Sequence, residues 1–247
     1  MTVKYDDPVA LEHGKLNIKP LREKPDFPTW AMKLTMAVTG LIFVLFVLFH
    51  MVGNLKVYTG EEHFDEYAHF LRRMGEPVFP HETVLWILRV VLIICLVLHV
   101  YCAFVLKARS KQSRGSEKRF GKVKNFNTFT ASSMLGTGSV LLLFIIFHIL
   151  DLTIGTEPVA SDKFESGSAY ANLVASFDRP VVAVFYILCM VVLFLHASHG
   201  IWTASSDLGI TGHRTRQVML WIAYLLPAIV MIGNISIPVA VLCGFGS

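Results

Sequence analysis

Residues 30–54 read WAMKLTMAVTGLIFVLFVLFHMVGN, an apolar run with one lysine near its start and one histidine near its end. A membrane-spanning helix needs about 20 apolar residues, so this run is long enough to cross a bilayer. Four similar runs follow, at about residues 84–106, 128–154, 180–203 and 218–242. The pattern predicts an all-α integral membrane protein with five transmembrane helices.

The composition favours the same class. Apolar residues make up 54% of the 247 residues, charged residues make up 16%, and the mean hydropathy is +0.57. Soluble domains have about 25% charged residues, so these values favour a membrane protein. We expect residues 1–29 to form a cytoplasmic N-terminal segment and residues 30–247 to form one transmembrane domain.

The placement of charge predicts the orientation. Six basic residues precede or begin the first run, and eight lie in the connection at residues 107–124, where Glu117 is the only acid. The connections at residues 55–83 and 151–178 are acidic instead, and the first of them has the apolar spacing of a short surface helix. The positive-inside rule then puts the N-terminus in the cytoplasm. A solvated loop that faces anionic lipids explains residues 107–124 better than a nucleic-acid site does.

Each of the first four predicted helices carries a candidate ligand among the ten histidines: His50, His99, His148 and His196. An ionisable side chain at membrane depth is costly and usually faces the protein interior. Taken singly, each of these rings fits a hydrogen-bonded interior histidine as well as it fits a ligand.

Depth along the helices sorts these histidines into two pairs. At 1.5 Å per residue, His50 and His148 lie about 9 Å below the outer ends of their helices, and His99 and His196 lie about 12 Å above the inner ends. The two layers are then on the order of 10 Å apart. Two facing imidazoles suit a heme iron, whereas zinc takes four ligands. Because no CxxCH motif is present, the pattern predicts two non-covalent b hemes, held by a bundle of the first four helices.

Other residues in these helices carry further predictions. Arg89 lies at the depth of the outer histidine pair, where it would bind a heme propionate or extend to the interface. His199 lies one turn after His196, and we expect it near the heme rather than on the iron; an interior hydrogen bond is the alternative. Several glycines would make room either for a porphyrin or for close helix packing: Gly40, Gly53, Gly136, Gly138 and Gly200.

Four motifs resemble those of one family. They are FHMVGNLKVYTG at residues 49–60, YAHFLRRMG at 67–75, SFDRP at 176–180 and LHASHGIWTASSDLG at 195–209. Nearly the whole chain resembles the five-helix, di-heme cytochrome b subunit of succinate dehydrogenases and fumarate reductases, in the b558 group. The resemblance implies that His99 and His196 hold an inner heme and that His50 and His148 hold an outer heme. The depth count gives the same pairs independently.

The resemblance also implies partners and a substrate. A flavoprotein with FAD and an iron–sulfur subunit would dock on the cytoplasmic face of a bacterial cell membrane, and succinate would react on the flavoprotein. Electrons would pass through the two hemes to a quinone, which is menaquinone in this group. The basic connection at residues 107–124 would then be a docking face. A higher oligomer of the complex is compatible with this arrangement, and no nucleic-acid partner is expected.

Two features concern proton chemistry. Glu76 and His81 lie in the loop near the outer heme, where each would exchange protons with a quinol or simply be solvated. Some fumarate-reducing relatives carry a membrane glutamate two residues before the fourth ligand, where this chain has Phe194. This departure favours succinate oxidation.

Two other classes of function stay open. A cytochrome b subunit of nitrate reductase or hydrogenase type tends to gather its ligands on fewer helices, whereas here each of four helices supplies one. A heme-free transporter or scaffold would need a polar path to mid-membrane, which Asn234 and Ser236 in the fifth run do not supply alone. The soluble subunits that co-purify with the chain would separate these classes.

Overall fold

The computed structural model describes residues 26–114 and 126–246. Within these ranges the chain has no strand, and five helices are long and apolar enough to cross a membrane. They are α2 (Thr29–Asn54), α4 (Thr83–Arg114), α5 (Phe126–Ile149), α7 (Pro180–Asp207) and α8 (His213–Leu242). The prediction of an all-α protein with five membrane-spanning helices is confirmed. Residues 1–25 of the predicted N-terminal segment and residues 115–124 of the basic connection lie outside the described residues.

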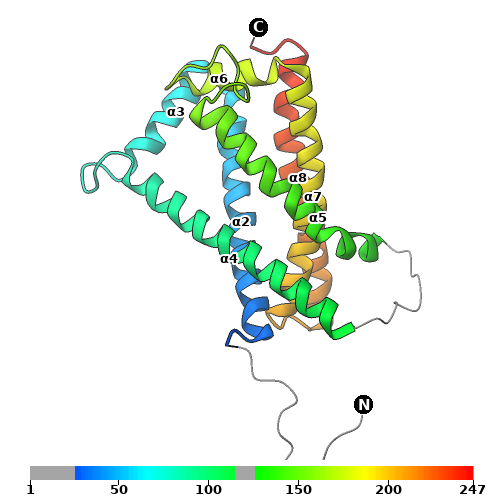
Figure 1. Ribbon diagram of the computed structural model, residues 1–247. Helices are drawn as coiled ribbons and strands as arrows, with labels where there is room; N and C mark the ends of the chain where they lie inside the picture. The colour runs from blue at the N-terminus through cyan, green and yellow to red at the C-terminus, as the bar shows by residue number, and fades with distance from the viewer. Residues whose placement is uncertain (1–25, 115–125, 247) are drawn as a thin grey trace, which may run out of the picture.

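Helices α2 and α7 form the centre of the bundle. Helix α2 contacts α4, α7 and α8, and helix α7 contacts α2, α5 and α8. Helix α4 crosses α2 obliquely, as Figure 1 shows. Helix α8 packs against both central helices, and two hydrogen bonds join it to the first helical segment. Asn54 Nδ2 donates to Asn234 Oδ1 at 3.4 Å, and the Tyr58 hydroxyl donates to Ser236 Oγ at 2.9 Å.

Three helices extend beyond the predicted spans. Helix α4 ends at Arg114 rather than near residue 106, α7 ends at Asp207 rather than near residue 203, and α8 begins at His213 rather than near residue 218. Hydropathy reports the part of a helix that crosses the bilayer. Polar residues with good helix propensity, such as Lys, Arg and Gln, can continue the helix into water.

Three short segments lie at one end of the bundle: η1 (Leu55–Thr59), α3 (Glu61–Arg73) and α6 (Ala169–Phe177). Helix α3 is the predicted surface helix, with two glutamates in its first turn and two arginines in its last, which suits the helix dipole. Gly60 makes the turn between η1 and α3 at φ +100°, a conformation that glycine adopts without steric cost. Helix α6 was not predicted. We call this region the α3–α6 end.

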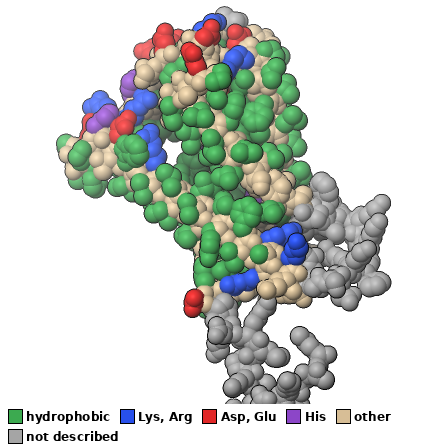
Figure 2. Space-filling model, viewed as in Figure 1, with side chains coloured by type: hydrophobic (Ala, Val, Ile, Leu, Met, Phe, Trp, Pro, Cys, Tyr) green, Lys and Arg blue, Asp and Glu red, His purple; other side chains and the backbone are tan. Residues whose placement is uncertain are grey.

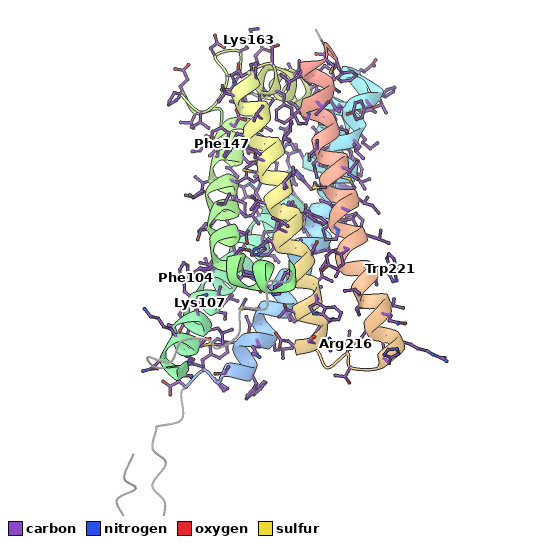
Figure 3. All side chains as sticks on the ribbon, turned by 90° about the vertical axis from the view of Figure 1, so that its right-hand side faces the viewer. Phe104, Lys107, Phe147, Lys163, Arg216 and Trp221 are labelled. Carbon is purple, nitrogen blue, oxygen red and sulfur yellow. The ribbon has the colours of Figure 1, made fainter. Side chains whose placement is uncertain are left out.

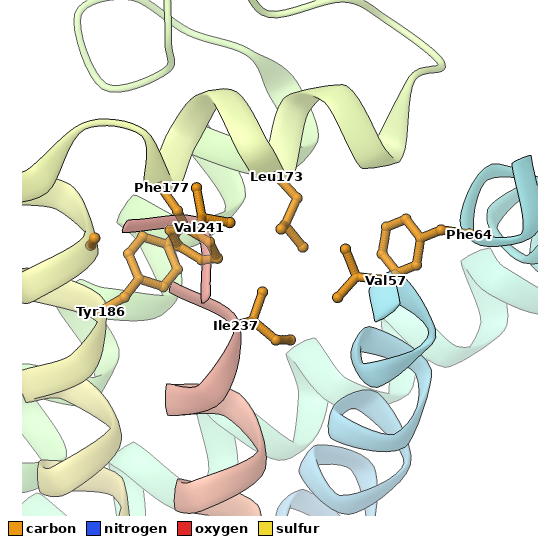
Figure 4. Packing of buried hydrophobic residues seen from close by; sticks show 8 residues of the cluster. Val57, Phe64, Leu173, Phe177, Tyr186, Ile237 and Val241 are labelled. Carbon is orange, nitrogen blue, oxygen red and sulfur yellow. The ribbon is translucent and has the colours of Figure 1, made fainter. Parts of the chain in front are cut away.

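A hydrophobic cluster joins the short segments to the long helices at the α3–α6 end (Figure 4). Phe64 of α3 and Leu173 of α6 pack there with side chains from η1, α7 and α8. Its buried members are Val57, Phe64, Leu173, Phe177, Ala183, Tyr186, Ile237 and Val241. This cluster fixes the α6–α7 turn against the bundle, next to the end of α5.

Charge is distributed unevenly along the bundle. Acidic side chains gather at the α3–α6 end in Figure 2. Lys107 and Arg216 both lie toward the opposite end, as Figure 3 shows. The predicted orientation rests on this asymmetry, because the positive-inside rule would put the end with Lys107 in the cytoplasm.

Candidate heme site

The four candidate ligand histidines lie in two facing pairs. The ring centroids of His50 and His148 are 5.8 Å apart, with an angle of 89° between the rings. The centroids of His99 and His196 are 6.4 Å apart, with an angle of 59°. Metal–imidazole bonds of about 2 Å would put two axial rings on one metal with their centroids roughly 6 Å apart. Both pairs therefore have the spacing that two axial ligands of one iron require.

The donor set fits heme better than zinc. Within residues 26–114 and 126–246, no group of three or more His, Cys, Asp or Glu side chains could hold a metal ion. A structural zinc site would need four such ligands. A heme iron takes four nitrogens from its own porphyrin and only two axial ligands from the protein.

A threonine of α2 orients His99. Thr39 Oγ1 lies 3.0 Å from His99 Nδ1, and the threonine hydroxyl donates its own proton to the carbonyl oxygen of Thr35 at 2.7 Å. The threonine oxygen therefore accepts a hydrogen bond from Nδ1–H of His99. This bond fixes the tautomer and leaves Nε2 of His99 as the nitrogen that can bind a metal.

A threonine of α5 orients His196 in the same way. Thr137 Oγ1 lies 3.1 Å from His196 Nδ1 and donates its proton to the carbonyl oxygens of Ser133 and Met134, each at 3.1 Å. Nε2 of His196 is again the nitrogen left for a metal. The two rings of this pair are thus held by equivalent neutral hydrogen bonds from opposite sides.

Glycines beside these threonines receive the histidine rings. A Cβ atom on Gly40 would lie 3.4 Å from His99 Cε1, and one on Gly138 would lie 3.2 Å from His196 Cε1. The Cβ on Gly138 would be tighter than an ordinary contact and would require the His196 ring to shift, whereas the Cβ on Gly40 would just touch the His99 ring, so both glycines suit a histidine packed close to the helix. Cβ atoms on Gly136 and Gly200 would meet nothing within 4 Å, which is compatible with space for a planar group. Gly53 instead accommodates the Tyr67 hydroxyl.

The sequence analysis singled out Gly40 and Gly138 but missed the threonines beside them and their contacts with the histidines, although the sequence carries a signal. Gly40 precedes His50 by ten residues, and Gly138 precedes His148 by ten residues. Helices α2 and α5 therefore repeat one arrangement. Each carries a Thr-Gly pair, here called a Thr-Gly seat, that contacts a ring of the His99–His196 pair. Ten residues after its glycine, each helix carries a histidine of the His50–His148 pair.

Aromatic side chains surround the His50–His148 pair. Phe46 stacks on His50 with a centroid distance of 5.4 Å and an angle of 17°. Phe144 lies 5.8 Å from His148, and the Tyr186 hydroxyl lies 3.4 Å from His148 Nδ1. The pair thus lies in an apolar environment that favours a bound macrocycle over water.

A comparison with known proteins found a relative of this chain. The chain is 27% identical to the succinate dehydrogenase cytochrome b558 subunit of Bacillus subtilis (strain 168) over 167 residues, which cover 68% of this chain and 73% of that protein. The chain is similar to a b558-type cytochrome. This match confirms the resemblance that the motifs indicated. No family model and no solved structure matches the chain.

Arg89 contacts residues near the beginning of α4. Its guanidinium lies 4.0 Å from Glu82 and 4.8 Å from the centre of the Trp86 ring. Glu82 also lies 3.7 Å from Arg72, so these charges join α3 to α4. The contacts are those of an arginine at a membrane interface. A propionate contact of Arg89 stays a prediction.

Glu76 and His81 lie together in the loop between α3 and α4. Hydrogen bonds with His81 and Arg73, both 3.1 Å long, hold the pKa of the Glu76 carboxyl below its usual range. A lowered pKa keeps this carboxylate ionised at neutral pH, which makes it a weak proton carrier. The contacts therefore favour a structural role, in which Glu76 holds the loop between α3 and α4 together. A quinone near Glu76 and His81 stays a prediction.

Substitution of His199 by alanine is expected to leave both hemes bound. His199 lies one turn after His196, but His196 is the ring that faces His99 and rests on the Thr137–Gly138 seat. The heme content per chain of the purified variant measures this. Loss of one heme would instead assign the axial position to His199.

Proposed function

We propose that this chain is the membrane anchor of a bacterial succinate:quinone oxidoreductase and that it holds two b hemes. The proposal rests on the two facing histidine pairs, whose ring centroids lie 5.8 and 6.4 Å apart. Four different helices supply these four rings. The similarity to a succinate dehydrogenase cytochrome b558 subunit supports the choice of enzyme. His50 with His148 would bind one heme, and His99 with His196 the other.

The partners follow from the same proposal. Succinate would be oxidised on a flavoprotein subunit with FAD, and an iron–sulfur subunit would dock on the end of the bundle that carries Lys107 and Arg216 (Figure 3). A surface rich in Lys and Arg suits an acidic partner. The hemes, when bound, supply one-electron carriers that link the iron–sulfur subunit to menaquinone in the bacterial cytoplasmic membrane. This chain's own residues hold those carriers and do no chemistry on succinate.

The purified complex is expected to contain two b hemes per copy of this chain, both low-spin. Each iron would have both axial positions filled by imidazole, which leaves no open site for water. A pyridine hemochrome assay, set against the amount of protein, measures the number of hemes. A value near one would mean that one histidine pair is not a heme site, and a value of zero would exclude a cytochrome.

The second candidate is a cytochrome b subunit of another respiratory enzyme, of nitrate reductase or hydrogenase type. One ligand candidate on each of four helices disfavours it, and the soluble subunits that co-purify would decide. A heme-free transporter is disfavoured by the contacts of the fifth long helix. Asn234 and Ser236 are used to bind Asn54 and Tyr58 rather than to line a path.

A further inference from the structure

A buried carboxylate lies one turn beyond His148. Asp151 is 1% exposed and lies in the π-helical turn η2 (Leu150–Ile154) that continues α5. Such turns often occur at functional sites, because they redirect side chains without ending the helix. Gly155 closes the turn at φ +74°, with its N–H bonded to the carbonyl oxygen of Leu150.

Three side chains from the α6–α7 region donate hydrogen bonds to Asp151. Arg179 Nη2 lies 2.6 Å from Oδ1, Ser176 Oγ lies 2.5 Å from Oδ2, and the Tyr186 hydroxyl lies 2.9 Å from Oδ2. A buried charge is costly unless it is paired and fully hydrogen-bonded, and Asp151 meets both conditions. Ser176 and Arg179 belong to the SFDRP motif, to which the proposed function gives no role.

Tyr186 joins this carboxylate to His148. The tyrosine hydroxyl has one proton, which it donates to Asp151, so its oxygen is the acceptor that faces His148 Nδ1 at 3.4 Å. His148 would then donate Nδ1–H to Tyr186 and keep Nε2 for the metal. The tyrosine ring also packs against the His148 ring, with a centroid distance of 5.9 Å.

The two histidine pairs therefore differ in the groups that hold their rings. The Nδ1 atoms of His99 and His196 face threonines whose protons go to neutral backbone carbonyls. Among the four rings, and within the described part of the chain, His148 is the one whose hydrogen-bond chain ends on a carboxylate. A negative charge behind an axial imidazole increases its electron donation to the iron and stabilises the oxidised state.

We propose that Asp151, acting through Tyr186, is a positioning residue that orients His148 and lowers the midpoint potential of the heme held by the His50–His148 pair. The inference rests on the proposed function, because it needs a heme at that pair. Arg179 and Ser176 hold the Asp151 carboxylate in place; they do not touch His148 in this arrangement.

The test is a redox titration of the b-heme absorbance in the whole complex carrying Asp151→Asn. The midpoint potential of one heme is expected to rise, and that of the other to stay unchanged, because the substitution removes the carboxylate and leaves Arg179 without its partner. Tyr186→Phe keeps the Asp151–Arg179 pair but removes the hydroxyl that contacts both Asp151 and His148, and it is expected to raise the same potential by less. In each variant, the low-spin electron paramagnetic resonance signal of that heme alone should shift.

Asp178→Asn is the matched control. Asp178 is an exposed carboxylate next to Arg179 in the same motif, so the variant loses one negative charge outside the network and both potentials should stay unchanged. If Asp151→Asn does not assemble, Tyr186→Phe decides. Unchanged potentials in a Tyr186→Phe complex that binds two hemes would overturn the inference. Fewer than two hemes in the unmodified complex would instead overturn the proposed function.

Discussion

Replacement of His196 by alanine is expected to remove one heme and to abolish the transfer of electrons from succinate to quinone. Alanine cannot bind the metal, and the remaining ring, His99, would hold only one axial position. His99→Ala should give the same result, because the two rings face each other across one site at 6.4 Å. The heme content and the reduction of the remaining heme by succinate, followed by absorbance, measure both effects.

The other pair provides the contrast. His50→Ala or His148→Ala should remove one heme but spare the reduction of the His99–His196 heme by succinate, because that heme would be nearer to the iron–sulfur subunit. His63→Ala is a suitable control, since this histidine lies on α3 with its side chain 68% exposed, and it should keep both hemes. Loss of both hemes in all four ligand variants would indicate a folding role and leave the order of electron transfer unproven.

Collapse of the membrane potential is expected to slow menaquinone reduction by succinate in sealed vesicles or cells. If the quinone is reduced near the His50–His148 heme, electrons move from the cytoplasmic side toward the positive side of the membrane. A full crossing then draws on the potential by about 2.3 kcal/mol per charge per 100 mV. The resemblance places Phe194 where some fumarate-reducing relatives have a membrane glutamate. Without that glutamate, proton transfer through the membrane along its path would not cancel the charge that the electrons move. The rate with and without an uncoupler measures the coupling.

Succinate oxidation by a soluble dye is the control for this experiment. The dye accepts electrons without a crossing of the membrane, so its rate should not respond to the uncoupler. Equal rates of menaquinone reduction with and without uncoupler, in membranes shown to be sealed and energised, would contradict a quinone site near the His50–His148 heme. A quinone site beside the His99–His196 heme would then replace it.

The sequence predicted the features that depend on one helix at a time. Apolar length located the five spans, and the helical rise gave the depths of His50, His99, His148 and His196. The structure brings together the rings that the depth count pairs, with centroids 5.8 and 6.4 Å apart. Their role as ligands stays a prediction that the heme assays address.

The features that were missed depend on packing between distant segments. Asp151, Tyr186 and Arg179 meet only because α6 and the turn after it fold back on the end of α5. A periodic pattern in one helix does not report which neighbour its side chains will face. The contacts of Arg89 with Glu82 and Trp86 likewise depend on packing in the folded chain, and its predicted propionate contact stays a prediction.

The Thr-Gly pairs would also fix how far apart the two proposed hemes can be. Gly40 marks the level of one site and His50 the level of the other, ten residues apart on one helix, or about 15 Å along the helix, which is longer than the roughly 10 Å expected from the depth count. Helix α5 repeats this interval between Gly138 and His148. An α-helix cannot stretch without losing its hydrogen bonds, so rigid backbone in two helices would set the distance between the two proposed hemes. Changes in the length of the surface connections would leave it unaltered, whereas one residue inserted between Gly40 and His50 would turn that histidine by about 100°.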